Sequence, residues 1–194
     1  MASAFSPTER EAIDKLLVQA ARQCAATIGI RKTTLEQLTQ QAGISKSAFY
    51  KFYESKEHLF FRIMEEWHAK VYSAAEEALK TSAALPMKER VAKALLSAFD
   101  AMEQGGMNAA FSQELPYLLR RLPPEILDES YRTDEEHIAA LIDLCGVDFT
   151  VPRETVQAML MILVTSLPGH QRIGPLYRPA LELLVHSLCE QIIR

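Results

Sequence analysis

Residues 33–59 read TTLEQLTQQAGISKSAFYKFYESKEHL, and this stretch decides the fold. Thr33 fits the N-cap of a short helix, because Glu36 stands three residues later and can return a hydrogen bond to the Thr33 amide. Gly43 ends that helix in a tight turn, and Ser45 caps a third helix that runs to about Phe52. Two helices of roughly seven to eight residues around a glycine turn match a helix-turn-helix in length and turn chemistry.

The third helix has one polar and one apolar face. Each side chain on the polar face can donate a hydrogen bond to a phosphate or a base edge: Lys46, Ser47, Tyr50 and Lys51. The apolar face can pack on the preceding helix and on the first helix of the chain: Ala48, Phe49 and Phe52. Lys56 lies in the first turn of the next helix, where the helix dipole disfavours a cation and a bound phosphate would offset the conflict. Any single lysine could be an ordinary solvated charge, but the combined pattern favours DNA binding.

The net charge of −4 is unevenly distributed along the chain. Between Arg31 and Lys56, five basic residues stand against two acidic ones, so this stretch carries +3 and the rest of the chain carries −7. A local basic face on an acidic body suits a protein that contacts an anionic polymer at one end only.

Outside this stretch, apolar residues recur at helical spacing, and no segment alternates as a strand would. Pro7 and Thr8 fit the start of the first helix, and Gly29 fits its left-handed stop. A long helix is expected from Lys56 to about Leu79. Later helices are expected from 86 to the glycine pair 105–106, over 108–121 with an interruption at Pro116, and over 123–146, 152–167 and 179–193. The chain is therefore predicted to be all-α, with about nine helices.

The last two helices are apolar around most of their circumference. Such helices are either fully buried in one subunit or form a self-association face, and the end of a chain favours the second alternative. The residues predicted to form a dimer interface are Leu160, Leu163, Leu181, Leu184 and Leu188.

The quoted stretch resembles the DNA-binding signature of the TetR family of transcriptional regulators, over about residues 7–66. The resemblance implies that Tyr50, Lys56, Thr33 and Thr34 contact phosphates, and that the side chains of Lys46, Ser47 and Lys51 face the major groove. Ser45 is also predicted to belong to the DNA-binding residues. Two residues depart from the family pattern: Thr39 stands where Ala is common, and Tyr53 stands where Phe is usual.

The rest of the chain, 67–194, resembles the family only in architecture. The resemblance implies a ligand-binding and dimerisation domain, a homodimer, a palindromic double-stranded DNA operator, and repression that is relieved when a ligand moves the linking helix. Two recognition helices of a dimer must sit about 34 Å apart to enter successive major grooves, so a small tilt of each long helix would spoil the fit.

Aromatic and flexible apolar side chains in the second part of the chain are typical of a small-molecule site, although ordinary core packing is the alternative for each of them. They suggest a small, hydrophobic effector rather than a sugar. The predicted ligand-binding residues are Trp67, Phe99, Met102, Phe111, Tyr117, Met159 and His170.

Other functional classes have less support. The sequence contains no phosphate loop, nucleophile elbow or zinc helix, so an enzyme is the weakest hypothesis and no cofactor or metal site is expected. No membrane span or secretory leader is apparent, and a cytoplasmic protein is expected. Three dispersed cysteines, Cys24, Cys145 and Cys189, favour buried thiols over redox sensing. A remaining alternative is an all-α interaction protein whose basic stretch binds an acidic partner.

Overall fold

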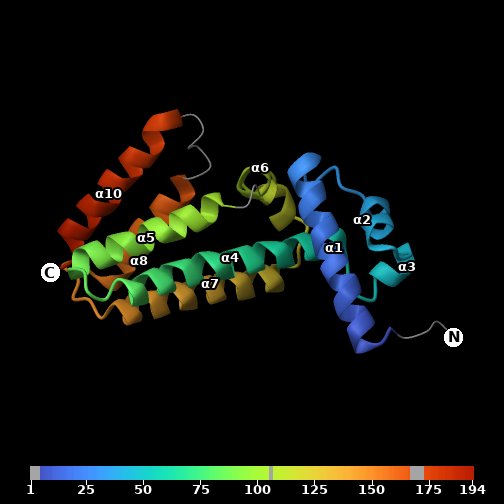
Figure 1. The fold of residues 1–194 in the computed structure, drawn as a ribbon, viewed down its shortest axis with the longest axis horizontal. Helices are drawn as coiled ribbons and strands as arrows, with labels where there is room; N and C mark the ends of the chain where they lie inside the picture. The colour runs from blue at the N-terminus through green and yellow to red at the C-terminus, as the bar shows by residue number, and fades with distance from the viewer. Residues whose placement is uncertain (1–4, 105–106, 167–172) are drawn as a thin grey trace. The chain divides into compact units, whose positions relative to one another are not determined.

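The computed structural model describes residues 5–104, 107–166 and 173–194, without the side chains of 107–112 and 164–166. Within these ranges the chain forms nine α-helices and a short 3-10 helix, and it contains no strand, which confirms the all-α prediction (Figure 1). The helices divide into two compact units: unit 1 comprises Met1–Trp67 and Gly106–Leu127, and unit 2 comprises His68–Gly105 and Asp128–Arg194.

Unit 1 contains α1 (Pro7–Thr27), α2 (Leu35–Ala42), α3 (Lys46–Phe49), the start of α4 (Lys56–Thr81) and α6 (Met107–Leu119). Helix α1 begins with a capping box between Ser6 and Glu9, and the chain leaves it through Gly29 at a φ of 85°. Figure 1 shows α2 and α3 lying beside α1. Their shared core includes Leu17, Leu38, Phe49, Phe60 and Leu118.

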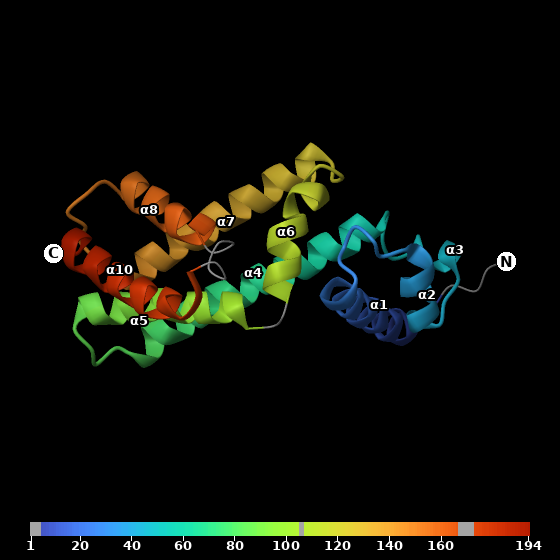
Figure 2. The same ribbon diagram turned by 90° about the horizontal axis from the view of Figure 1, so that it is seen from above.

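Unit 2 contains the rest of α4, α5 (Met87–Glu103), most of α7 (Pro124–Cys145), α8 (Arg153–Ser166), the 3-10 helix η2 (Gly174–Leu176) and α10 (Tyr177–Ile192). Helices α5 and α10 pack against each other, as Figure 2 shows. Residues Phe149 and Ile193 form an isolated antiparallel bridge that ties the C-terminus to the α7–α8 connection. All three cysteines are buried free thiols, as predicted.

Several helix boundaries differ from the sequence prediction. The N-cap of α2 is Thr34 and not Thr33, and α3 ends at Phe49 and not near Phe52. Beyond Phe49 the amides of Lys51 and Phe52 bond to carbonyls three residues back, so the chain continues as tight turns. Pro116 lies inside α6 and does not interrupt it, since a proline removes one backbone hydrogen bond without always ending a helix.

The packing of α6 bears on the predicted division at 66/67. Contacts divide the chain after Trp67, but they also group Gly106–Leu127 with unit 1. The chain therefore leaves unit 2 after α5, contributes α6 to unit 1 and returns to unit 2 within α7.

Candidate nucleic-acid interface

The helix pair α2 and α3 is fixed by local capping. Thr34 Oγ1 accepts the Gln37 amide at 3.3 Å, and the Thr34 amide donates to Gln37 Oε1 at 2.8 Å. Gly43 ends α2 at a φ of 68°, and nothing lies within 4 Å of a Cβ added there, so backbone conformation rather than space calls for glycine. Ser45 Oγ then accepts the Ala48 amide at 3.1 Å and starts α3.

The segment that begins with α3 separates into a buried and an exposed side, as its sequence pattern predicts. Ala48 and Phe49 are buried, and Phe52 is half-buried against the core of unit 1. The exposed side carries Ser45, Lys46, Ser47, Tyr50 and Lys51, and Thr34 at the start of α2 is exposed as well. Tyr50 keeps 57% of its surface exposed, so it is open to a partner outside the chain.

Several exposed side chains of this segment have weak partners within the chain. Lys46 Nζ lies 2.8 Å from Glu36 Oε1, and this hydrogen bond lowers the pKa of Glu36. Both groups are largely in water, so the pair can exchange for another anion at little cost. The Lys51 ammonium lies 5.4 Å from the centre of the Phe5 ring. These cations therefore remain available to a polyanion.

Thr33 and Lys56, both predicted to contact phosphates, use their side chains within the fold. Thr33 is only 2% exposed, and its hydroxyl donates to the Gly29 carbonyl at 2.7 Å. Lys56 Nζ donates to the carbonyls of Ile30, Arg31 and Thr33 at 2.9, 3.1 and 2.6 Å. Three carbonyls match the three ammonium protons, so these acceptors offset the dipole conflict that the sequence prediction assigned to a phosphate. Burial lowers the pKa of Lys56.

Arg10 is a neighbour of the exposed segment that sequence reasoning missed. Its guanidinium donates to the Lys51 carbonyl at 3.1 Å, and Cζ lies 5.0 Å from the centre of the Phe52 ring. Arg10 is exposed, so a further cation stands beside Lys51. No local spacing could reveal this neighbour, because 41 residues separate Arg10 from Lys51.

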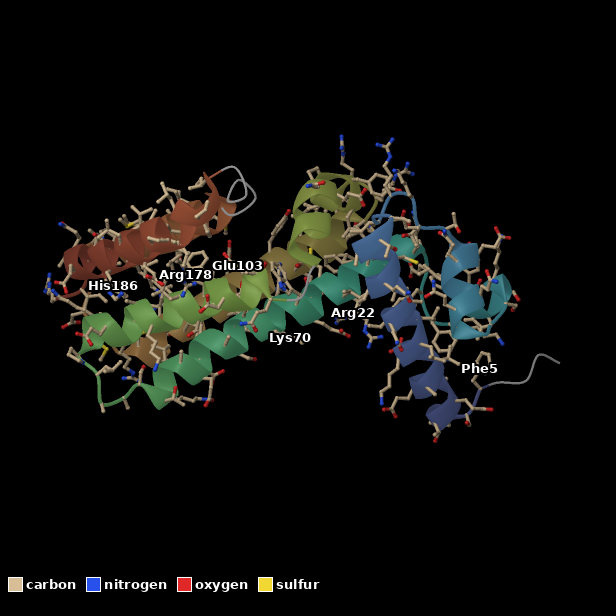
Figure 3. All side chains as sticks on the ribbon, turned by 45° about the horizontal axis from the view of Figure 1, so that its top comes forward. Phe5, Arg22, Lys70, Glu103, Arg178 and His186 are labelled. Carbon is tan, nitrogen blue, oxygen red and sulfur yellow. The ribbon has the colours of Figure 1, made fainter. Side chains whose placement is uncertain are left out.

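A polar network fixes α1 against α4. The Tyr53 hydroxyl donates to Asp14 Oδ1 at 2.5 Å, and Arg62 Nη1 donates to both Asp14 oxygens at 2.7 and 2.6 Å. Arg22, labelled in Figure 3, donates to Glu66 Oε2 at 2.8 Å. Burial raises the pKa of Tyr53. The hydroxyl by which Tyr53 departs from the family pattern thus has two charged partners, one on α1 and one on α4.

A family sequence model described as bacterial regulatory proteins, tetR family, matches residues 17–63, which include α2, α3 and the start of α4. The N-terminal region that holds the helix-turn-helix thus matches the TetR family of transcriptional regulators. The chain is 25% identical over 129 residues to the uncharacterized HTH-type transcriptional regulator YhgD of Bacillus subtilis (strain 168), a match that spans 66%, just under two thirds, of each chain. The matched family and this relative are described as regulators and not as enzymes.

Solved structures share the fold of the chain. A TetR family transcription regulator from Marinobacter aquaeolei VT8 is 16% identical, with a TM-score of 0.63 and coverage of 97% of this chain and 99% of the other. The fatty acid degradation regulator FadR from Bacillus halodurans is 17% identical, with a TM-score of 0.64 and coverage of 96% of both chains. At these identities the likeness concerns the fold alone.

The predicted ligand-binding residues fall in both units. Phe99 lies in the buried core of unit 2, and Met102 and Met159 are partly buried against that core. Trp67 and Tyr117 belong to unit 1, where Tyr117 packs against that unit's core. The side chains of Phe111 and His170 lie outside the described residues.

The predicted interface residues also divide. Leu181 is only 3% exposed and packs in the core of unit 2, so a second subunit cannot cover it; the sequence pattern could not tell the inner from the outer side of α10. Leu160, Leu163 and Leu188 are partly buried against the same core, whereas Leu184 is 59% exposed. Other large exposed apolar side chains of α8, η2 and α10 are Met161, Ile162, Leu176 and Leu183.

Within the described ranges, no three histidine, cysteine or acidic side chains are grouped so that they could hold a metal ion. Among the helices described, none has the length and apolar character that crossing a membrane requires.

Proposed function

We propose that the protein is a regulator of the TetR family that binds a palindromic DNA operator as a homodimer, and that a small hydrophobic effector relieves its repression of transcription in the cytoplasm. The observation that carries the proposal is the exposed, hydrogen-bonding side of α3 on a fully packed, capped helix pair. Such a surface has its donors outward and its position fixed, which is what base and phosphate recognition in a major groove requires.

The DNA-contacting residues in this proposal are the exposed ones: Thr34, Ser45, Lys46, Ser47, Tyr50 and Lys51. Tyr50 and Thr34 suit phosphates, since a hydroxyl donates one hydrogen bond at a fixed place. Lys46 and Lys51 suit phosphates or guanine edges. In this proposal Thr33 and Lys56 shape the interface through the backbone before Thr34 rather than through their own side chains.

The dimer is supported by the exposed apolar side chains of unit 2. Among the described helices, α8 and α10 carry four exposed large apolar residues: Met161, Ile162, Leu183 and Leu184. Large apolar side chains exposed on two helices suit an interaction site, and a second copy of the chain brings the same side chains by symmetry. We assign the outward side of α8 and α10 to this contact.

The effector part of the proposal rests on Phe99, Met102 and Met159. One aromatic and two flexible thioether side chains lie in a single apolar cluster of unit 2. Methionine adapts its shape at low cost, so such a cluster can open around an apolar molecule. A screen of apolar compounds by thermal unfolding, followed by release of bound DNA, tests this part.

Lys51→Ala tests DNA recognition against a matched control, Lys70→Ala. Lys70 is an exposed lysine of α4 in unit 2, labelled in Figure 3. Binding is measured by fluorescence anisotropy with the preferred duplex and a scrambled duplex at several salt concentrations. Only Lys51→Ala should bind DNA more weakly. If Lys51 contacts a base, the preference between the two duplexes should also change, and if it contacts a phosphate, the slope of log affinity against log salt should be smaller by about 1. Equal behaviour of both variants, with binding independent of DNA sequence, would instead support an acidic partner protein.

A further inference from the structure

The backbone of the α1–α2 turn, residues 28–33, is held by side chains from two distant helices. From α6, Glu114 Oε2 accepts the Arg31 amide at 2.9 Å. From α4, the Lys56 ammonium donates to three carbonyls of the same turn. The turn ends at Thr33, directly before the N-cap of α2, so groups that hold it also fix where the DNA-reading helices begin.

Glu114 packs directly on the backbone of this turn. A Cβ built at Gly29 would lie 2.8 Å from Glu114 Oε1, closer than real Cβ atoms approach, and 3.1 Å from Oε2, which is a tight contact. Gly29 also has a φ of 85°, which other residues rarely adopt. The absence of a side chain at Gly29 therefore lets the carboxylate reach the Arg31 amide.

Tyr117 stands three residues after Glu114 and contacts the other holding group. Its hydroxyl donates to Oε1 of Glu57 at 3.1 Å, and Glu57 directly follows Lys56 in the chain. Its ring centre lies 5.9 Å from Lys56 Nζ and 5.9 Å from Arg31 Cζ, within the range of cation–π attraction. Burial raises the pKa of Tyr117. One turn of α6 thus contacts both the α1–α2 turn and the lysine that holds it.

The path of the chain connects α6 to both units. Segment Gly106–Leu127 belongs to unit 1, but the segments before and after it belong to unit 2. Helix α6 is therefore joined covalently at both ends to the unit that holds the candidate effector cluster. Only residues 104–106 separate α5 from α6 in the chain, and only 120–123 separate α6 from α7, so α6 is the segment of unit 1 to which a rearrangement of α5 or α7 can be transmitted most directly along the chain.

We propose that Glu114 and Tyr117 form a latch that holds the α1–α2 turn and so sets the affinity of α2 and α3 for DNA. Both act as positioning residues that do not contact DNA. The inference deepens the proposed function, since it names the element through which an effector would reach the DNA-binding helices. Release of the Glu114 carboxylate frees the Arg31 amide and leaves the start of α2 less well positioned to contact a DNA phosphate.

The test compares Glu114→Ala and Glu114→Gln with Glu125→Ala, which removes the same charge from an exposed residue in the first turn of α7. Removal of an acidic residue ordinarily strengthens DNA binding, because electrostatic repulsion falls. The latch predicts the opposite sign for Glu114→Ala: operator affinity about tenfold weaker, as for the loss of one charge-assisted hydrogen bond, with an unchanged salt slope. Glu114→Gln keeps an acceptor oxygen and should fall between parent and Glu114→Ala.

Hydrogen exchange of the Arg31 amide measures the latch without DNA. Exchange should accelerate in Glu114→Ala and remain at the parent rate in Glu125→Ala. The latch is overturned if exchange in Glu114→Ala is unchanged, or if a Glu114→Ala variant with the parent's circular dichroism binds the operator as tightly as Glu125→Ala does. In either case the proposed function still stands, provided that the parent binds the operator. If the parent bound no operator, accelerated exchange would still establish the contact, and the proposed function alone would fail.

Discussion

Leu184→Ala in α10 should weaken the dimer and leave the fold intact. Complete burial of a leucine stabilises by about 1.5–3 kcal/mol, and Leu184 has 59% of its surface left for a partner to cover. Truncation to alanine then removes about 1 kcal/mol per subunit. Each face occurs twice in a two-fold dimer, so the loss is about 2 kcal/mol, or about 30-fold in the dimer Kd.

Sedimentation equilibrium over a concentration series measures that Kd, and Leu184→Glu should shift the equilibrium further because it places a charge in the interface. Leu85→Ala is the matched control, since Leu85 is 40% exposed in the connection between α4 and α5. A folded Leu184→Glu variant with the parent's Kd would refute the assignment of this face. Leu181→Ala should instead lower the free energy of unfolding by about 2–5 kcal/mol, because that side chain lies in the core.

Three further variants probe unit 1. Tyr50→Phe should weaken binding to every duplex about tenfold in anisotropy titrations, with no change in thermal midpoint, since the hydroxyl it removes belongs to an exposed side chain. Tyr53→Phe should lower the free energy of unfolding by about 1–2 kcal/mol in a denaturant titration, because Asp14 and Arg62 lose a hydroxyl partner; an unchanged midpoint would count against the network. Thr34→Ala should cost about 1 kcal/mol of stability as a lost N-cap, and a scan without a lower midpoint would contradict that role.

Local signals predicted the helix-turn-helix well. Gly43 and Ser45 act within three or four residues of themselves, and the structure places both as expected. The one-residue error at the start of α2 has a specific cause. The sequence prediction paired Thr33 with Glu36, whereas in the structure Thr34 forms the capping box with Gln37 and the Thr33 hydroxyl donates to the Gly29 carbonyl four residues back.

Contacts between distant residues were beyond sequence reasoning. The position of Lys56 shows that its charge is unfavourable at the start of a helix. The groups that compensate for this charge are carbonyls 23 to 26 residues earlier in the chain. The partner of the Tyr53 hydroxyl is 39 residues away, and the partner of Glu114 is 83 residues away. Periodicity fixes which residues share a helix face, but not which of two apolar faces turns inward, and for this reason Leu181 and Leu184 were grouped together.

The central claim is that α3 reads DNA as part of a symmetric dimer, and selection of bound duplexes from a random pool tests it most directly. The proposal predicts a palindromic consensus with half-sites about one helical turn or slightly more apart, and an affinity that falls steeply with salt. A pool with no enriched sequence, and weak binding that is the same for every duplex, would contradict it.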